Sequence, residues 1–431
     1  MNRMNTEYSV KEIERNRPET GGPGENDLII ARDCYYDMDC CKTQLNNNVL
    51  VIGTSGAGKT RSIVTPNLLQ AVGSYIVSDP KGNLYHKYGE YLQSKGYRVI
   101  NIDFTNPADS MHYNPLAYMR SSQDVMKLAH VLMAADERTS DPIWNEMAQV
   151  LVQACLAFLF ECAPLEERTL ENLVELIDAT TVEGEAERKK SNADAAFTNL
   201  RKVNPKSYAV KQYDKFRVAA DKTYRSIQAV TNAKTGQFST PEIFEMTSRN
   251  EIDFSRIGTE KTAVFVGCSD TDRSMDFLVN LFYTQAMAEL CRFADKECKN
   301  NALPVPVRFI LDDFATNCKI EDFPRMIASI RSRNISTMLM IQAESQLEEC
   351  FDKDGKTIIG NCDTYVYLGG NDLDTAQSVA ERADVPLKKI LYMPVGTNWV
   401  FRRGKAPVNS ANFDLEDFLE KKMNRQAWLE I

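Results

Sequence analysis

The spacing of glycines and a Lys-Thr pair in residues 53–60 fits the pattern G-x-x-x-x-G-K-T. This pattern binds nucleotide phosphates when a strand precedes it and a helix follows it. The apolar run 49–52 predicts that strand and residues 61–64 predict that helix, whereas a structural glycine turn is the alternative. The residues predicted to bind nucleotide in this loop are Gly53, Thr54, Ser55, Gly56, Ala57, Gly58, Lys59 and Thr60.

The chemistry of such a loop depends on its backbone and its last two residues. The glycines let N–H groups surround an anion, and the N-terminus of the following helix adds its positive dipole end. The Lys59 ammonium can then reach the β- and γ-phosphates, and the Thr60 hydroxyl can ligate Mg²⁺.

Two adjacent acids, Asp312 and Asp313, follow the apolar run 307–311. An acid at the end of a strand can lie beside Mg²⁺, and a second can orient or deprotonate the attacking water. Acids are also common where a strand turns into a loop, so the pair is informative only together with the phosphate loop. We therefore expect neighbouring parallel strands to bring Lys59, Thr60 and Asp312 side by side.

Two further positions fit the hydrolysis of a nucleoside triphosphate. Arg331 lies at the end of a helix predicted from residue 323, where it could act on the γ-phosphoryl group bound by a neighbouring subunit. A basic helix C-terminus favoured by the helix dipole is the equal alternative. Gln342 ends the next predicted strand, from which its side chain could sense the γ-phosphate.

The elements around these residues alternate between strand and helix. The helix 83–94 lies between two of the strands, and such alternation predicts a mostly parallel sheet flanked by helices. The predicted strands are 49–52, 74–78, 98–102, 262–267, 307–311, 337–341, 364–368 and 399–401. Only helical periodicity occurs between residues 121 and 229. The predicted organisation is a flexible polar leader (1–27), a nucleotide-binding domain in two parts (28–118 and 230–431) and an inserted all-α domain (119–229).

Composition places the chain among globular proteins of reducing compartments. It has 431 residues with 43% hydrophobic residues, and its eleven cysteines are scattered, which indicates free thiols. The longest apolar stretch, 150–160, is shorter than a membrane span, and residues 1–26 lack the apolar core of a signal peptide. We therefore expect a cytoplasmic protein, and the three distant histidines give no sign of a histidine-based metal site.

Charge is unevenly distributed along the chain. The net charge is −9, but residues 188–225 hold eleven Lys or Arg against three Asp, a local +8 that leaves −17 for the remainder. A basic segment on an acidic body can contact a polyanion, and it can equally be a solvated helical face.

Several segments in order resemble the TraG/TraD-type coupling proteins of conjugation and type IV secretion. They span residues 48–385 and are, besides the phosphate loop, Pro66-Asn67-Leu68, Asp79-Pro80-Lys81-Gly82, Tyr113-Asn114-Pro115-Leu116, residues 222–227, residues 311–315, residues 330–336, residues 342–347 and residues 360–370.

This resemblance implies a RecA-like P-loop NTPase that carries an inserted all-α domain facing the cytosolic substrate. It also implies a homo-hexameric ATPase, dependent on ATP and Mg²⁺, that moves single-stranded DNA with its attached relaxase toward a secretion channel. By resemblance, Asp313 and Lys59 are catalytic, Thr60 and Asp312 hold the metal, Arg331 is the arginine acting in trans and Gln342 is the sensor.

The sequence departs from this family in two respects. Family members typically carry two N-terminal membrane helices, and none is predicted here. A separate membrane-anchor subunit, a soluble variant and a truncated product all fit this difference, and the first places the protein peripherally at the inner face of the cell membrane. The second acid is Asp313 where Glu is common, and its shorter side chain predicts slower hydrolysis or none.

Two other functions fit the same residues. One is an FtsK/HerA-type DNA translocase, which uses the same chemistry to move chromosomal or genomic DNA. The other is a non-hydrolysing adaptor that binds ATP and recruits protein substrates. This hypothesis is based on Asp313 and on the acidic net charge.

Overall fold

The computed structural model describes residues 22–133, 142–181, 191–218, 221–269, 271–317 and 320–420. The first 21 residues of the predicted leader lie outside the described residues. Strand β1 (Asp27–Ala31) begins at the last residue of the predicted leader. This strand forms a two-stranded antiparallel sheet with β2 (Cys34–Asp37), and the sequence analysis predicted neither.

A mixed sheet forms the centre of the molecule, and its strand order is β11-β10-β9-β3-β8-β7-β4-β6-β5. All neighbours from β9 to β5 pair in parallel, whereas β10 and β11 form an antiparallel hairpin at one edge. The strands are β3 (Val49–Ile52), β4 (Ser74–Ser78), β5 (Arg98–Asp103), β6 (Thr262–Gly267), β7 (Val307–Leu311), β8 (Ile335–Ile341), β9 (Thr364–Tyr367), β10 (Thr397–Arg402) and β11 (Val408–Ala411). Every predicted strand is present, with ends within two residues of the prediction, and β11 was not predicted.

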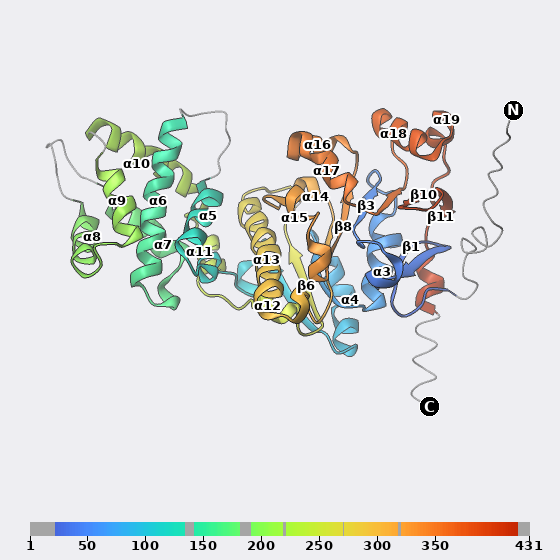
Figure 1. Cartoon of the computed structure of the whole chain (residues 1–431), viewed down its shortest axis with the longest axis horizontal. Coiled ribbons are helices and arrows are strands. Elements are labelled where there is room, and N and C mark those ends of the chain that lie inside the picture. Colours follow the sequence, from blue (N-terminus) through green and yellow to red (C-terminus); the bar gives the residue numbers. More distant parts are fainter. Residues whose placement is uncertain are drawn as a thin grey trace.

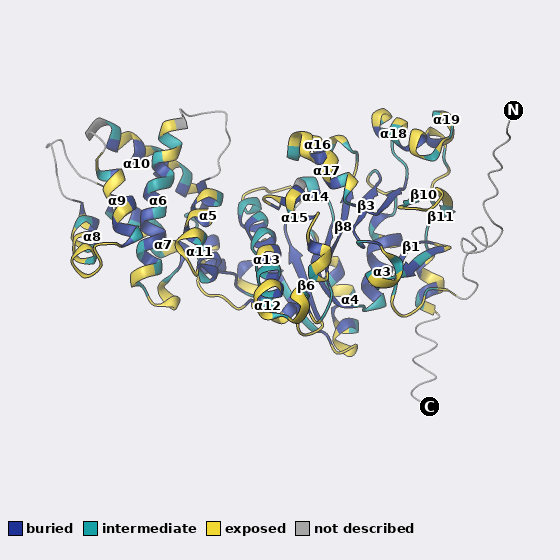
Figure 2. Ribbon diagram, viewed as in Figure 1, coloured by how far each residue is buried: buried dark blue, intermediate teal, exposed yellow. Residues whose placement is uncertain are grey.

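Strand β3 shows how the sheet is buried on both faces. All four of its residues are buried, and they alternate between two hydrophobic clusters. Val49 and Val51 pack with Leu68 and Leu92 on one face, whereas Leu50 and Ile52 belong to the cluster on the other. Figure 2 shows the strands as the buried centre of this half of the molecule. Because both faces of the sheet are covered, most residues of its strands are apolar.

Helices cover both faces of the sheet. On the face of Val49 lie the β1–β2 hairpin, α3 (Thr65–Gln70) and the predicted helix α4 (Asn83–Ser94). The other face packs against α13 (Asp276–Glu297). Shorter helices between the later strands are α14 (Phe314–Asn317), α15 (Phe323–Met326), α16 (Ser345–Phe351), α17 (Gly355–Gly360), α18 (Leu373–Ala383) and α19 (Leu387–Leu391).

The described residues between β5 and β6 form helices and no strand. These are α5 (Ser122–Met133), α6 (Pro142–Cys162), α7 (Leu170–Ala179), α8 (Asn192–Val203), α9 (Tyr208–Arg217), α10 (Asp221–Thr235), α11 (Pro241–Thr247) and α12 (Phe254–Ile257). Figure 1 shows α5 to α11 gathered at one end of the molecule, away from the sheet. The helices continue beyond residue 229, and the division of the chain at residues 119 and 229 stays a prediction.

Helix α6 is the central helix of this group. Its segment Ile143–Cys162 is long and apolar enough to cross a membrane by length and composition alone, contrary to the expectation that no segment is. Half of its apolar window is buried against the rest of the protein. The core helix of a helical bundle passes the same test, and α6 packs against α5, α9 and α10.

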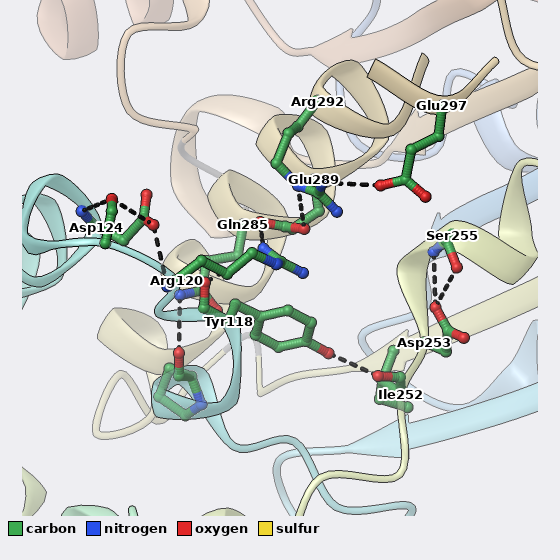
Figure 3. Close-up of polar contacts among 12 residues, drawn as sticks. Tyr118, Arg120, Asp124, Ile252, Asp253, Ser255, Gln285, Glu289, Arg292 and Glu297 are labelled. Atoms are coloured by element: carbon green, nitrogen blue, oxygen red, sulfur yellow. Dashed lines mark hydrogen bonds and ion pairs between the residues drawn. The ribbon is translucent and has the colours of Figure 1, made fainter. Parts of the chain in front are cut away.

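Polar contacts join the helical end to the sheet (Figure 3). The Arg120 guanidinium donates to Oε1 of Glu289 on α13 at 2.6 Å, and Arg292 donates to the other oxygen of Glu289 at 3.1 Å. The Tyr118 hydroxyl donates to the carbonyl of Ile252 at 2.8 Å. Both connections between the sheet and the helical end are thus held by hydrogen bonds.

A buried histidine lies at the same junction. The Nδ1 and Nε2 atoms of His112 lie 2.9 Å from Oε2 of Glu251 and 3.1 Å from Oε1 of Glu245. The backbone N–H of His112 also donates to Glu251, and this hydrogen bond is the main reason why the pKa of Glu251 is lowered.

Candidate nucleotide-binding site

The predicted site residues come together at one edge of the sheet. Strands β3, β8 and β7 run in parallel, so their carboxyl ends meet there, and they lead into Gly53, Gln342 and Asp312 respectively. The expectation that β3 and β7 are neighbours is wrong, because β8 lies between them. The loop and the acid still meet, since loops beyond the carboxyl ends of parallel strands converge at one edge.

The phosphate loop is anchored at its start and turned by its glycines. The N–H groups of Gly53 and Thr54 donate to the carbonyls of Ile341 (3.1 Å) and Gly369 (3.2 Å) at the ends of β8 and β9. Gly56 and Gly58 have φ values of 79° and 93°, where a side chain would strain the backbone. The loop therefore has the backbone that lets N–H groups face an anion.

Lys59 lies over this loop. Its side chain is largely buried, and Nζ donates to the carbonyl of Gly53 at 2.6 Å. The ammonium is thereby held within the curve of the loop, where it can exchange this carbonyl for a phosphate oxygen.

The helix predicted after the loop begins as a π-helix, η1 (Thr60–Val64), and continues as α3. Pro66 near the start of α3 has no N–H and crowds the preceding turn. This favours the hydrogen bonds of a π-helix, which span five residues, in the turn before it. The buried side chain of Asn67 fixes this helix to β1, because it exchanges hydrogen bonds with both the N–H (2.9 Å) and the carbonyl (2.6 Å) of Ile29.

The direct contact between the two predicted motifs is a hydrogen bond from the Thr60 hydroxyl to Oδ2 of Asp312 at 3.1 Å. Burial raises the pKa of Asp312, the charge of Asp313 adds to this effect, and the bond from Thr60 opposes it. Because partial burial disfavours the charged form of this carboxyl group, a cation beside it would stabilise that form. Ser78, which the sequence analysis missed, donates to the carbonyl of Asp312 at 3.3 Å.

Asp313 has a left-handed backbone with φ of 49°. Its N–H donates to Oδ1 of Asp312 at 3.1 Å, which turns the chain sharply after β7. Aspartate tolerates this conformation better than longer side chains do. The local backbone thus gives a physical reason for Asp at this position.

Arg331 is not brought to the loop of its own chain. It lies in the 3₁₀ helix η7 (Ile330–Arg333), just before the amino end of β8, whereas the loop lies at the carboxyl end. The helix predicted to run from residue 323 to this arginine is wrong, because α15 ends at Met326. Burial raises the pKa of the Cys40 thiol, and the charge of the nearby Arg331 opposes this rise.

Gln342 follows β8 and therefore lies between the loop and the acids. Gln342 is exposed, and its backbone N–H donates to Oε1 of Gln346 at 2.7 Å. The role of Gln342 as a sensor of the γ-phosphate stays a prediction.

Asn412, just beyond β11, also reaches the loop and was not predicted. Its Nδ2 lies 3.5 Å from the carbonyl of Ala57. The isolated residue gives no signal in the sequence, because β11 is short and largely polar.

Metal-binding capacity is limited in the part of the chain that the structure describes. No group of three or more His, Cys, Asp or Glu residues there is arranged to hold an ion. Thr60 and Asp312 supply two neighbouring oxygen atoms, 3.1 Å apart, which suits a hard cation that takes its other ligands from phosphates and water.

The sheet order, the anchored loop and the Thr60–Asp312 contact together define a RecA-like P-loop NTPase fold. The sequence matches the family described as "Type IV secretory system Conjugative DNA transfer" over residues 10–383. The chain belongs to this family.

Curated relatives share low sequence identity with the chain. The protein VirD4 of Rhizobium rhizogenes is 22% identical over 342 residues, which cover 77% of this chain and 48% of VirD4. The VirD4 protein of Agrobacterium fabrum is also 22% identical, with the same coverage. The chain thus spans about half the length of the curated relatives it matches.

A solved structure confirms the fold. The plasmid coupling protein TrwB in complex with ADP and Mg²⁺ superposes with a TM-score of 0.67 at 14% identity, covering 94% of this chain and 92% of TrwB. VirB4 of Thermoanaerobacter pseudethanolicus superposes with a TM-score of 0.56 at 11% identity, covering 92% of this chain and 98% of VirB4.

Proposed function

We propose that this protein is the ATP-driven coupling protein of a type IV secretion system and delivers single-stranded DNA with its bound relaxase to the channel. The observation that carries the proposal is the Thr60–Asp312 hydrogen bond, which joins the phosphate loop to the acid of β7. Membership of the conjugative DNA transfer family and the likeness to VirD4 support the transport role.

The residues present fit ATP and Mg²⁺. The glycine-turned loop offers N–H groups, Lys59 offers a largely buried positive charge, and Asp312 carries a half-buried carboxylate. A complex of the structural relative TrwB with ADP and Mg²⁺ supports the same pair of cofactors. When bound, Mg²⁺ supplies positive charge that neutralises the phosphate oxygens.

Each protein group has a defined task in ATP hydrolysis. The loop N–H groups orient the phosphates, the Lys59 ammonium stabilises charge on the β- and γ-phosphates, and the Thr60 hydroxyl turns from Asp312 toward the cation. Asp313 accepts a proton from the attacking water. The side chain of Gln342, between the two motifs, detects whether the γ-phosphate is present.

A ring accounts for the position of Arg331. Because this arginine lies at the opposite end of β8 from the loop of its own chain, a role for it in catalysis requires nucleotide bound by another subunit. We therefore infer a homo-hexameric ring in which Arg331 of one copy completes the site of the next.

The basic segment 188–225 is the proposed DNA contact on the helical end, which would form the inserted domain. Residues 188–190 and 219–220 lie outside the described residues. Arg201 pairs with Asp214, and Arg217 lies 3.4 Å from Asp194, so these charges are partly neutralised. The exposed side chains of Lys202 and Lys206 on the same segment are the better candidates for phosphate contacts.

The proposed location is the cytoplasm, with attachment to the inner face of the cell membrane through secretion-channel components or a separate membrane-anchor subunit. The helix α6, though apolar enough for a span, packs within the helical group, and this packing supports a place outside the membrane.

One observation favours a second candidate, the non-hydrolysing adaptor. Asp313 is one methylene shorter than the glutamate common at this position, so its carboxylate reaches less far toward an attacking water. A DNA translocase of the FtsK/HerA type has no observation of its own in this structure.

An ATPase assay with and without single-stranded DNA tests the proposal. We expect DNA to stimulate turnover in the wild type, and Lys59→Ala to abolish nucleotide binding or turnover while far-UV circular dichroism stays unchanged. ATP binding without turnover in the wild type would favour the adaptor, and normal turnover in Lys59→Ala would refute the site.

A further inference from the structure

The segment 392–396 lies at the same edge of the sheet as the phosphate loop. Strand β9 pairs in parallel with β3 and ends at Tyr367, whereas β10 runs antiparallel to β9 and begins at Thr397. The residues that lead into β10 are therefore placed at the edge where β3 and β9 end. Figure 1 shows α19, which precedes this segment, beside that edge.

Two chains of contacts fix this segment to the loop. On one side, Met393 packs near Gly369, whose carbonyl accepts the N–H of Thr54, the second loop residue. On the other side, the carbonyl of Gly396 accepts the N–H of Asn412 at 2.8 Å. The Asn412 side chain in turn reaches the carbonyl of Ala57 in the loop. The segment is thus linked to the loop through Gly369 on one side and through Asn412 on the other.

The segment exposes apolar side chains. Tyr392 is 78% exposed and Val395 is 96% exposed. Val395 lies in a tight turn closed by the hydrogen bond from the N–H of Thr397 to the carbonyl of Pro394 at 3.2 Å, with Gly396 at φ of 87°. Such turns usually carry polar residues, so an apolar residue at this tip suggests a ligand.

We propose that Tyr392 and Val395 bind the nucleobase of the nucleotide whose phosphates are bound by residues 53–60. The inference rests on the proposed function, because it needs a nucleotide on that loop. A base extends from the phosphates by the length of a ribose, and the exposed Tyr392 ring, next to Met393 in the chain, offers an aromatic face at this edge of the sheet. Tyrosine stacks on the π-face that every base has, and the valine covers the edge of the base.

Stacking without hydrogen bonds from other side chains discriminates weakly between bases. We therefore expect the segment to strengthen the binding of ATP and GTP alike. Substitution of the tyrosine should weaken both nucleotides by a similar factor.

Calorimetric titration of Tyr392→Ala with ATP, GTP and inorganic tripolyphosphate, each with Mg²⁺, tests the proposal. We expect about tenfold weaker binding of both nucleotides, on the order of 1.4 kcal/mol, and unchanged binding of tripolyphosphate, which has no base. Tyr392→Phe keeps the ring and should bind as the wild type does. Val395→Ser should weaken the nucleotides, whereas Val203→Ser, at an equally exposed site on α8, should not.

The outcomes separate the two proposals. If wild-type protein binds nucleotide and tripolyphosphate and Tyr392→Ala binds both as strongly, the base site is refuted while the phosphate site stands. If the wild type binds neither, the proposed function fails and the base site with it. If Tyr392→Ala leaves nucleotide affinity unchanged but alters the sedimentation of the protein, these residues contact another copy of the chain instead.

Discussion

The substitution Asp312→Asn should have opposite effects on stability with and without nucleotide. Burial and the neighbouring charge of Asp313 raise the pKa of Asp312, which means that the folded protein disfavours its charged form. Asparagine removes this charge, and its oxygen can accept the Asp313 N–H while its amide nitrogen donates to the Thr60 hydroxyl oxygen. Without ligands the variant should therefore be more stable than the wild type, by about 1 kcal/mol.

Nucleotide should reverse this order. At a free MgATP concentration of about 100 times the Kd, the wild type gains about 2.7 kcal/mol in free energy of unfolding. Because Asp312 is the half-buried acid proposed to hold the cation, the asparagine variant should gain no more with Mg²⁺ than with ATP and EDTA. Urea unfolding at neutral pH under the three conditions measures both effects.

The control for this experiment is Asp313→Asn. Its left-handed backbone also suits asparagine, so this variant should keep the Mg²⁺-dependent gain while turnover falls. The reasoning is wrong if Asp312→Asn is less stable than the wild type without ligands, or if it keeps the full gain from Mg²⁺.

Four other predictions follow from the structure. Arg331→Ala should lose ATPase activity and recover part of it when mixed with Lys59→Ala subunits, because intact arginines and intact loops then meet between copies. Lys206→Glu should weaken binding to single-stranded DNA and flatten its salt dependence, measured by fluorescence anisotropy. Gly73→Ala should lower the free energy of unfolding by about 2 kcal/mol or more, since φ is +77° and a new Cβ would lie 2.4 Å from a backbone carbonyl oxygen. Glu251→Gln should lower the melting temperature at pH 7, and this difference should disappear as the pH falls below the ordinary pKa of glutamate and through the lowered pKa of Glu251.

Matched controls and contrary outcomes accompany these experiments. Gly236→Ala adds a methyl group in open space and should leave stability nearly unchanged, so equal losses at the two glycines would contradict the steric argument. Lys405→Glu makes the same charge change on the exposed turn before β11 and should leave DNA affinity unchanged. Mixed subunits without any recovered activity would count against Arg331 in trans. A constant difference for Glu251→Gln across the pH range would show that charge is not involved.

Much of the sheet could be predicted because its strands are buried on both faces. Continuous apolar runs such as 263–266 and 338–341 have few other structural explanations. The hairpin β1–β2 and the short strand β11 escaped prediction, since their residues are partly polar and their pairing depends on contacts distant in sequence. Strand order is likewise a property of tertiary packing, so the insertion of β8 between β3 and β7 could not be read from the motifs.

The site was predicted in its residue types more than in its geometry. The spacing of glycines and Lys59 predicts a loop that the structure confirms as a loop between β3 and a helix. The left-handed backbone of Asp313, the π-helical start at Thr60 and the reach of Asn412 depend on local strain and on distant contacts. None of these leaves a pattern in the sequence.

Strand β8 has a mechanical consequence for the proposed ring. Its seven residues are all buried and are bonded to a parallel partner on each side, so it behaves as a stiff rod of roughly 20 Å. Gln342 follows one tip and Arg331 precedes the other. A displacement caused by loss of the γ-phosphate at the Gln342 end would be transmitted along the strand to Arg331. Hydrolysis at one site would then move the arginine that acts on the nucleotide of the neighbouring subunit, so the sites of the proposed ring would be active in turn.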